Sequence, residues 1–239
     1  MTRKTTVEVV QMLPLGMLNA FLIINGSNVI LVDTGLPNSE GKVEKSLKKN
    51  GLGWSNVRAI VLTHAHIDHV GSAKQIQSLT AAPIIAHTGD LPYLQGGRPL
   101  LRPTGPFGQL FEKTGAIEKP FASFLPDLIF SSESLDLTEF GAPARIMHTP
   151  GHTPGSISVL IDDVQVIAGD LAASGIFLGG IALKNRPKQP PFEEDPQQVA
   201  KSLAALLSLG CTRFYLGHGG PLGADKIRKH VAFLEMALA

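Results

Sequence analysis

Apolar positions along the chain fall into short runs separated by polar or glycine-rich segments. The runs at residues 6–12, 18–24 and 29–32 are rich in β-branched residues and predict three strands. Asn25-Gly26-Ser27 lies between the second and third runs and predicts a hairpin turn, so the chain is expected to open as an antiparallel meander. Similar runs predict later strands at residues 59–62, 83–86, 128–130, 135–137, 143–148, 156–161, 164–168 and 213–216.

Apolar residues at helical spacing predict four helices between these strands. Ser39 is placed to cap the first helix, and Asp195 followed by Pro196 begins the third. Mixed strands and helices in this order favour an α+β protein with two helix-covered sheets over one doubly wound sheet. The apolar faces of the helices are Val43 and Leu47; Ala73, Ile76 and Leu79; Val199, Leu203, Leu206 and Leu207; and Ile227, Val231, Leu234 and Leu238.

Residues 88–127 interrupt this pattern with prolines, glycines and scattered aromatic residues. We expect an irregular insertion with one or two short helices inside a single domain that spans residues 1–239. Long ordered loops of this kind often act as lids or binding loops. A surface or homodimer-contact flap is an equally open interpretation.

Composition narrows the class of protein. A hydrophobic content of 44% with 17% charged residues is ordinary for a compact enzyme, and a net charge of +1 argues against a nucleic-acid partner. The single cysteine, Cys211, excludes an internal disulfide and is expected to pack as a small apolar residue. No signal peptide is recognisable, and the apolar stretch 171–183 is too short and glycine-rich to span a bilayer. We therefore expect a cytoplasmic protein that acts on a small molecule without a membrane partner.

Candidate chemistry is concentrated between Thr63 and Gly71, which read T-H-A-H-I-D-H-V-G. Histidine and aspartate directly after a buried strand must be paired or desolvated, so a metal centre is the working hypothesis. Three further metal-type side chains follow predicted strands in loops rich in glycine or proline. A set of five imidazoles and two carboxylates without sulfur suits two divalent ions, most favourably zinc, with iron or manganese as alternatives. The set comprises His64, His66, Asp68, His69, His152, Asp170 and His218.

These motifs resemble the metallo-β-lactamase superfamily. The resemblance also includes Asp33-Thr34-Gly35 upstream and Gly151-His152-Thr153-Pro154-Gly155-Ser156 downstream. It implies a four-layer αβ/βα sandwich with the metal ions at the edge of the two sheets. It further implies one ion on His64, His66 and His152, a second on Asp68, His69 and His218, a bridging Asp170, and an Asp33 that orients a ligand.

The resemblance implies a hydrolase in which a metal-bridging hydroxide attacks a carbonyl and Asp68 acts as the catalytic proton shuttle. Asp170 is similar to the bridging residue of the glyoxalase II and lactonase branches, whereas Ala173 stands where acyl-homoserine lactonases carry a tyrosine. The expected substrate is an ester, lactone or thioester, with an apolar or acyl group. Zinc β-lactamase-type amide hydrolysis and an iron-dependent oxidoreductase similar to persulfide dioxygenases are the alternatives.

Substrate contacts are the least defined part of the prediction. The candidates are Phe107 and Phe111 in the insertion, with Phe177 and Lys184 farther along the chain. Lys184 begins a basic run with Arg186 and Lys188, which is either a solvated loop or an anchor for a substrate carboxylate.

Three histidines have no match in the ligand pattern. His87 follows a predicted strand, so it either lines the pocket or, as the favoured interpretation, has a surface or core role, and His148 is assigned a structural role. His230 is placed on the polar side of the last helix and is expected to be solvated.

Overall fold

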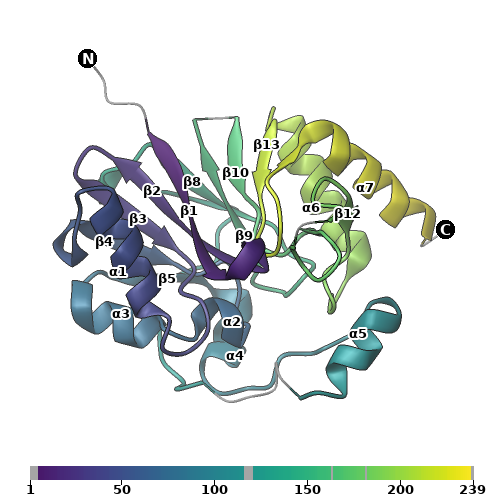
Figure 1. Ribbon diagram of the computed structural model, residues 1–239, viewed down its shortest axis with the longest axis horizontal. Coiled ribbons are helices and arrows are strands. Elements are labelled where there is room, and N and C mark those ends of the chain that lie inside the picture. Colours follow the sequence, from purple (N-terminus) through teal and green to yellow (C-terminus); the bar gives the residue numbers. More distant parts are fainter. Residues whose placement is uncertain (1–4, 116–120, 163, 181, 238–239) are drawn as a thin grey trace.

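Two six-stranded sheets lie face to face in the middle of the molecule, and helices cover their outer faces (Figure 1). The computed structural model describes residues 5–115, 121–162, 164–180 and 182–237, without the side chain of Phe107. Leu238, expected on the last helical face, lies outside this part. The predicted α+β fold of two helix-covered sheets is confirmed.

The first sheet has the strand order β1-β2-β3-β4-β5-β6. The strands β1 (Thr6–Leu13), β2 (Leu18–Asn25) and β3 (Asn28–Val32) form the predicted antiparallel meander. From β3 onward the pairing is parallel, through β4 (Val57–Val61), β5 (Ile84–His87) and β6 (Leu128–Phe130). The carboxyl ends of β3, β4 and β5 therefore meet at one edge of the sheet.

The second sheet has the order β14-β13-β10-β9-β8-β7. Pairing is antiparallel except between β10 and β13, so β8, β10 and β13 run in the same direction. Their carboxyl ends meet at one edge as well. The strands are β7 (Ser134–Asp136), β8 (Ala144–His148), β9 (Ile157–Ile161), β10 (Gln165–Ile167), β13 (Arg213–Tyr215) and β14 (Leu222–Gly223).

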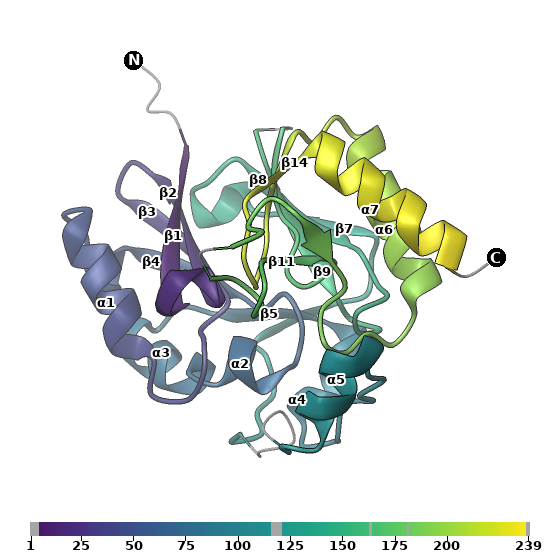
Figure 2. The same cartoon turned by 45° about the vertical axis from the view of Figure 1, so that its right-hand side comes forward.

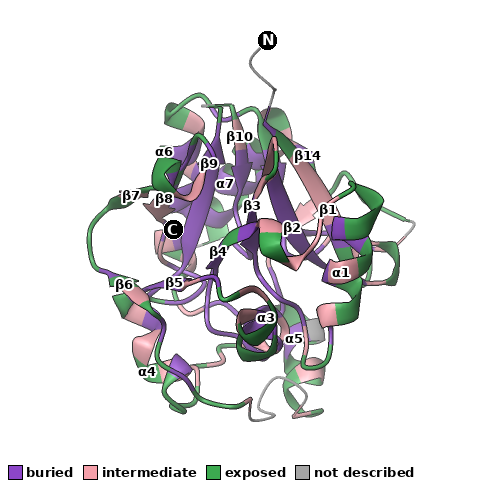
Figure 3. Cartoon of the chain, turned by 90° about the vertical axis from the view of Figure 1, so that its left-hand side faces the viewer, coloured by how far each residue is buried: buried purple, intermediate pink, exposed green. Residues whose placement is uncertain are grey.

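Three apolar clusters hold the four layers together. Phe21, Ile23 and other residues of both sheets form the central cluster, whereas Leu22, from the other face of β2, packs toward the outer helices. Both faces of these strands are buried, which is why they read as continuous apolar runs. Figure 3 shows the buried strands between helices that are exposed on their outer sides.

The helices fall into an outer pair on each side. On one side α1 (Glu40–Lys49) and α3 (Ala73–Thr80) cover the first sheet, and on the other α6 (Pro196–Ser208) and α7 (Ala224–Ala237) cover the second (Figure 1). Asp195 caps α6 as predicted, accepting a hydrogen bond from the Gln198 backbone N–H. Helix α1 follows Ser39 as predicted, but the Ser39 hydroxyl makes no capping hydrogen bond. Cys211 is buried in the apolar cluster beneath α6 and α7, as predicted.

The insertion contains two short helices, α4 (Leu91–Leu94) and α5 (Gly105–Glu112). It is attached to the segment before α6: the Thr104 N–H donates to the Pro191 carbonyl at 2.8 Å, and the Glu193 N–H donates to the Arg102 carbonyl at 3.0 Å. Figure 2 shows α4 and α5 below the strand ends. The insertion therefore lies beside the edge at which both sheets place their functional loops.

One prediction about the last helix is wrong. His230 is 2% exposed and lies on the inner side of α7, not in solvent. Helix α7 contacts α6, β14 and the short strand β12 (Pro187–Lys188), and these contacts cover a face that helical spacing alone marks as polar.

Among the described residues, no helix is long and apolar enough to cross a membrane.

Candidate metal centre

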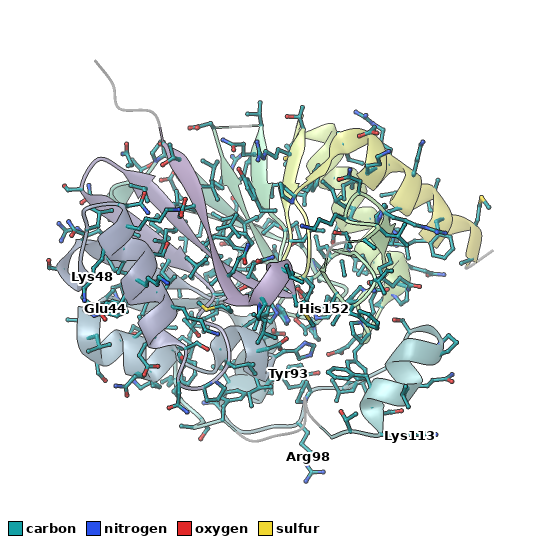
Figure 4. The ribbon with its side chains drawn as sticks, in the orientation of Figure 1. Glu44, Lys48, Tyr93, Arg98, Lys113 and His152 are labelled. Atoms are coloured by element: carbon teal, nitrogen blue, oxygen red, sulfur yellow. The ribbon has the colours of Figure 1, made fainter. Side chains whose placement is uncertain are left out.

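The seven predicted ligand residues converge where the two sheets meet. His64, His66, Asp68 and His69 follow β4, the last two on the short helix α2 (Ile67–Val70). His152, Asp170 and His218 arrive from the loops after β8, β10 and β13. His152 lies near the middle of the molecule (Figure 4). Residues more than 150 positions apart thus share one site because both sheets end there.

The ligand atoms form three compact groups. Within each group all atoms lie within 4.8 Å of one another. The side chains are buried, except that Asp68 remains 18% exposed. Asp68 is therefore the candidate ligand most open to an incoming substrate. The groups are His64, His66 and His152; His64, His69 and Asp170; and Asp68, His69 and His218.

The donor atoms fit bound cations. Within the described part of the chain, Nε2 of His64, Nε2 of His69 and Oδ1 of Asp170 are buried without a hydrogen-bond partner, although burying a polar group unpaired is costly. His66 Nδ1 and His152 Nε2 lie 3.1 Å apart, near the roughly 3.3 Å expected for two nitrogens bound tetrahedrally at about 2.0–2.1 Å from zinc. A shared cation accounts for both observations.

Hydrogen bonds on the far side of three rings direct their Nε2 atoms into the cluster. His69 Nδ1–H donates to Asp33 Oδ2 at 2.8 Å, and His64 Nδ1–H donates to the Thr63 hydroxyl oxygen at 3.0 Å. That hydroxyl in turn donates to Asp33 Oδ2 at 2.8 Å. His218 Nδ1–H donates to the Met17 carbonyl at 2.5 Å. Each bond leaves the Nε2 lone pair available, which is the tautomer that metal binding requires.

Asp33 has the orienting position that the sequence resemblance implies. It lies directly after β3 with a φ of 62°, a conformation that aspartate tolerates better than most residues. Its Oδ1 also accepts the Thr63 N–H at 2.8 Å. One carboxylate therefore fixes both the start of the histidine loop and the ring of His69.

Asp90 has a comparable role that the sequence analysis missed. Its Oδ2 accepts hydrogen bonds from the Ala65 N–H and the Thr153 hydroxyl, both at 2.8 Å, and its Oδ1 accepts from the Gly155 N–H at 2.7 Å. Ala65 lies between two candidate ligands, and Thr153 follows a third. Asp90 thus connects the loop after β4 to the loop after β8. Its place before Leu91-Pro92 resembles an ordinary helix start, so no local signal distinguishes it.

Electrostatics separate the first group from the rest. Burial lowers the pKa of His66 to about 4 and that of His152 to about 3, and it lowers the pKa of His64 well below its usual value. These three rings are neutral at physiological pH. Neutral imidazole is the form that binds a cation.

The other four candidate ligands, His69, His218, Asp68 and Asp170, favour their charged forms. Burial opposes charge on His69, but Asp170, Asp68 and Asp33 raise its pKa to about 9. The pKa of His218 is likewise raised, chiefly by Asp170 against the effect of burial. Burial opposes charge on the carboxyls of Asp68 and Asp170 as well. Their contacts with His69 and His218 nevertheless hold both pKa values below their usual range. A divalent cation bound there would replace the positive charge that these protons supply.

A cavity of 470 Å³ opens onto the cluster. Its remaining walls are apolar, and they include Phe111 from α5 and Phe177, two of the four predicted substrate contacts. Lys184 instead lines a separate hollow with Val9 and Gln11, and the side chain of Phe107 is outside the described part. The other apolar lining residues are Leu13, Met17, Leu18, Leu36, Ile67, Leu178, Pro191 and Phe192.

Two further titratable features lie close to this site. Glu193, next to Phe192, is 2% exposed. Its Oε2 accepts a hydrogen bond from Gln189 at 2.7 Å, and its Oε1 is buried with no hydrogen-bond partner among the residues that the structure describes. Burial raises its pKa to about 7.

His87 stacks on His148 with ring centroids 3.7 Å apart, outside the lining of the cavity, as a structural role requires.

Comparisons with known proteins agree with this geometry. The family model described as the metallo-beta-lactamase superfamily matches residues 13–218. A probable metallo-hydrolase of Bacillus subtilis, YflN, is 29% identical over 224 residues, covering 88% of this chain and 82% of its own. The hydroxyacylglutathione hydrolase GloC of Haemophilus influenzae is 29% identical over 163 residues, 67% of each chain.

Solved structures share the fold. A metallo-beta-lactamase family protein from Thermus thermophilus superposes with a TM-score of 0.68 at 22% identity, covering 97% of this chain and 80% of its own. The FEZ-1 metallo-beta-lactamase of Legionella gormanii gives a TM-score of 0.68 at 18% identity, covering 97% and 92% of the two chains.

Proposed function

The chain belongs to the metallo-beta-lactamase superfamily, and from that premise we propose that it hydrolyses a carbonyl ester, lactone or thioester with an apolar acyl group. The coarser statement, that it is a metallo-hydrolase of this superfamily, follows from the family match and the metallo-hydrolase relatives. The bond and the acyl group are our proposal.

The character of the cavity carries the proposal. Ten apolar side chains surround the opening to the His/Asp cluster, and the described lining includes no lysine or arginine. Away from the metal centre, an anionic group of the substrate would meet no lysine or arginine on the described walls, whereas an acyl chain would gain about 25 cal/mol for each Å² of apolar surface removed from water. The attachment of the insertion to residues 190–194, which brings Phe111 to this wall, supports a binding-loop role for residues 88–127.

The cluster would hold two divalent ions, one on His64, His66 and His152 and one on Asp68, His69 and His218, with Asp170 between them. Bound there, such ions would polarise the substrate carbonyl and activate a water molecule as nucleophile. Asp68 Oδ2 lies 3.3 Å from His218 Nε2 and is the most exposed carboxylate of the cluster. We assign it the transfer of a proton from the nucleophile to the leaving oxygen or sulfur.

A thioester is the favoured bond among the three. The relative GloC is named a hydroxyacylglutathione hydrolase, and hydroxyacylglutathiones are thioesters. The glutathione part itself carries carboxylates, which the apolar cavity does not match. We therefore propose the same thioester bond, between an apolar acyl group and a thiol other than glutathione.

Elemental analysis of the purified protein, followed by a panel of lactone, thioester, β-lactam and phosphodiester substrates, tests the proposal. We expect about two zinc ions per chain and turnover confined to ester-type carbonyls. A single iron ion with oxygen consumption and no hydrolysis would overturn it.

Acyl selectivity gives a sharper test. Phe177→Ala should lower kcat/KM for an octanoyl thioester by about tenfold and for an acetyl thioester by less than about twofold, because only the longer chain reaches that wall. Phe233→Ala is a matched control on α7, where Phe233 is 53% exposed and outside this cavity. Equal losses on both thioesters would contradict the acyl assignment.

A further inference from the structure

A second hollow, of 810 Å³, lies against α7 and is lined by none of the metal-centre residues. Its other wall is formed by residues 175–176, 183 and 185–189, including β12, which packs against α7 (Figure 1). The basic run noted in the sequence ends here: Arg186 and Lys188 line this hollow. The proposed hydrolysis uses none of these residues.

Positive charge is concentrated at this hollow. Arg186 and Lys188 face it from one wall, and Lys226 and Lys229 face it from α7. The described lining contains no aspartate or glutamate. Asp225 is a neighbouring acid, and it pairs with Lys226 at 3.6 Å from a side chain that is 65% exposed. Because the whole chain carries a net charge of only +1, four cations around one hollow are a local feature.

The floor of the hollow holds a buried polar group. His230 lines it, is 2% exposed, and has a buried Nε2 without a hydrogen-bond partner among the described residues. Such an atom ordinarily has a partner in a folded protein. A ligand oxygen is one group that would satisfy it.

Apolar side chains complete the rim. Phe233 is 53% exposed and Ile176 is 46% exposed, and both line the hollow. An exposed aromatic face beside cations suits a ligand that combines a flat ring with anionic groups. Lys188 fixes this wall, since its Nζ donates to the Ile176 carbonyl at 2.9 Å.

We propose that this hollow binds a nucleoside diphosphate, with the phosphates on Lys226, Lys229 and Arg186 and the base against Phe233. Phosphate oxygens accept charge-assisted hydrogen bonds from lysine and arginine, and the concave shape favours a small molecule over an extended polyanion. The site is independent of the proposed hydrolysis. It adjoins that cavity nonetheless, because Phe177 and Leu178, directly after Ile176, line the cavity at the metal centre.

Calorimetric titration of the metal-loaded protein with ADP and with inorganic pyrophosphate at low ionic strength tests the site. The variant Lys226→Gln/Lys229→Gln should weaken ADP binding at least tenfold, whereas Arg228→Gln should leave it within twofold. Arg228 is exposed on the same helix and does not line the hollow, so it removes the same type of charge without touching the site. Phe233→Ala should weaken ADP at least fivefold and leave pyrophosphate unchanged.

ADP or pyrophosphate that bound to the metal ions would bind equally to the wild type and to all variants, so it would not produce the expected differences between them. Identical ADP isotherms for wild type and the double lysine variant would overturn the site. Equal weakening by Arg228→Gln would also overturn it by showing a general charge effect. If the protein bound vesicles of phosphatidylcholine and phosphatidylserine through these lysines but did not bind ADP, the nucleotide site would be wrong and the hollow would instead be a membrane contact. If Phe233→Ala weakened both anions equally, the base contact would be wrong.

Discussion

Asp90 is the residue whose contacts best explain how the two histidine loops are held together. A buried carboxylate with three hydrogen-bond donors is well satisfied, and an amide in its place would turn an NH₂ group toward at least one of them. Leaving such donors unpaired costs about 1–3 kcal/mol each. This side chain therefore helps to fix the spacing between the loop that carries His66 and the loop that carries His152.

We predict that Asp90→Asn weakens metal binding as well as stability. Zinc affinity should fall about tenfold or more in competition with a chromogenic chelator, and the melting temperature of the metal-free protein should fall too. Asp127→Asn is the matched control, because Asp127 accepts the Ile84 N–H at 2.8 Å without contacting either loop. Wild-type zinc affinity in a folded Asp90→Asn protein would contradict the positioning role.

Glu193 determines a pH dependence of stability. Burial raises its pKa to about 7 in the folded protein, against 4.5 for an ordinary glutamate. Between those values the folded state binds more protons than the unfolded state, so this residue makes stability fall as pH rises through the window. Above the pKa of the folded state, the buried carboxylate is charged, and the full free-energy cost of burying that charge lowers the stability of the protein.

Glu193→Gln should therefore stabilise the protein by about 2 kcal/mol at pH 8.5 and leave it nearly unchanged at pH 4.5. Glutamine can still accept the Gln189 hydrogen bond. Urea unfolding of wild type and variant at both pH values measures the difference, in which the titration of other groups cancels. A gap that is the same at both pH values would show that Glu193 titrates normally.

At the level of elements, the site is built from strand ends and the glycine-containing turns that follow them. Gly217 begins the bend that follows β13, and it lies against the cluster. A Cβ at this position would come 2.2 Å from Asp170 Oδ1 and 2.7 Å from His69 Cε1. Only a residue without a side chain lets this loop bring His218 to the other ligands.

Gly217→Ala should accordingly lower zinc affinity by about tenfold or more while the protein remains folded. Gly41→Ala on α1 serves as the control, since a Cβ there meets nothing within 4 Å. That change should stabilise the protein by about 0.5–1 kcal/mol, because alanine is the better helix former. Full zinc content in Gly217→Ala at limiting metal would refute the close-packing argument.

At the scale of the whole molecule, the candidate ligands join the two sheets. Four come from the loop after β4 of the first sheet, and three come from loops of the second. Cations bound between them would stabilise the folded state by about 4 kcal/mol at a thousandfold excess over Kd.

Removal of metal with a chelator should lower the melting temperature by about 10 °C, given about 2–4 °C per kcal/mol for a chain of this size. Added zinc should restore the original value. His218→Ala should show a smaller response to the chelator than wild type. If the chelator left the melting temperature unchanged, metal binding at the cluster would not contribute to the stability of the fold.

Local sequence was sufficient for the longer strands, for most helices and for the seven residues brought together at the cluster, but not for the two-residue strands β12 and β14. Strands buried on both faces read as apolar runs, and the turns after them carry glycine or proline with the functional side chain. Predicted boundaries differ from the observed ones by one or two residues in most strands, as for residues 59–62 against Val57–Val61. These features depend on neighbours in the chain, which a sequence displays directly.

Tertiary structure alone decided the rest. The contacts of Asp90 join residues 25 to 65 positions apart, and the cavity walls combine Leu13, Phe111 and Phe192. His230 is polar by helical spacing yet buried, because α7 packs against α6, β14 and β12. Arg186 and Lys188 read as a loop until α7 places Lys226 and Lys229 opposite them. Burial and charge at a position depend on which distant segment packs there, and the order of residues alone does not contain that information.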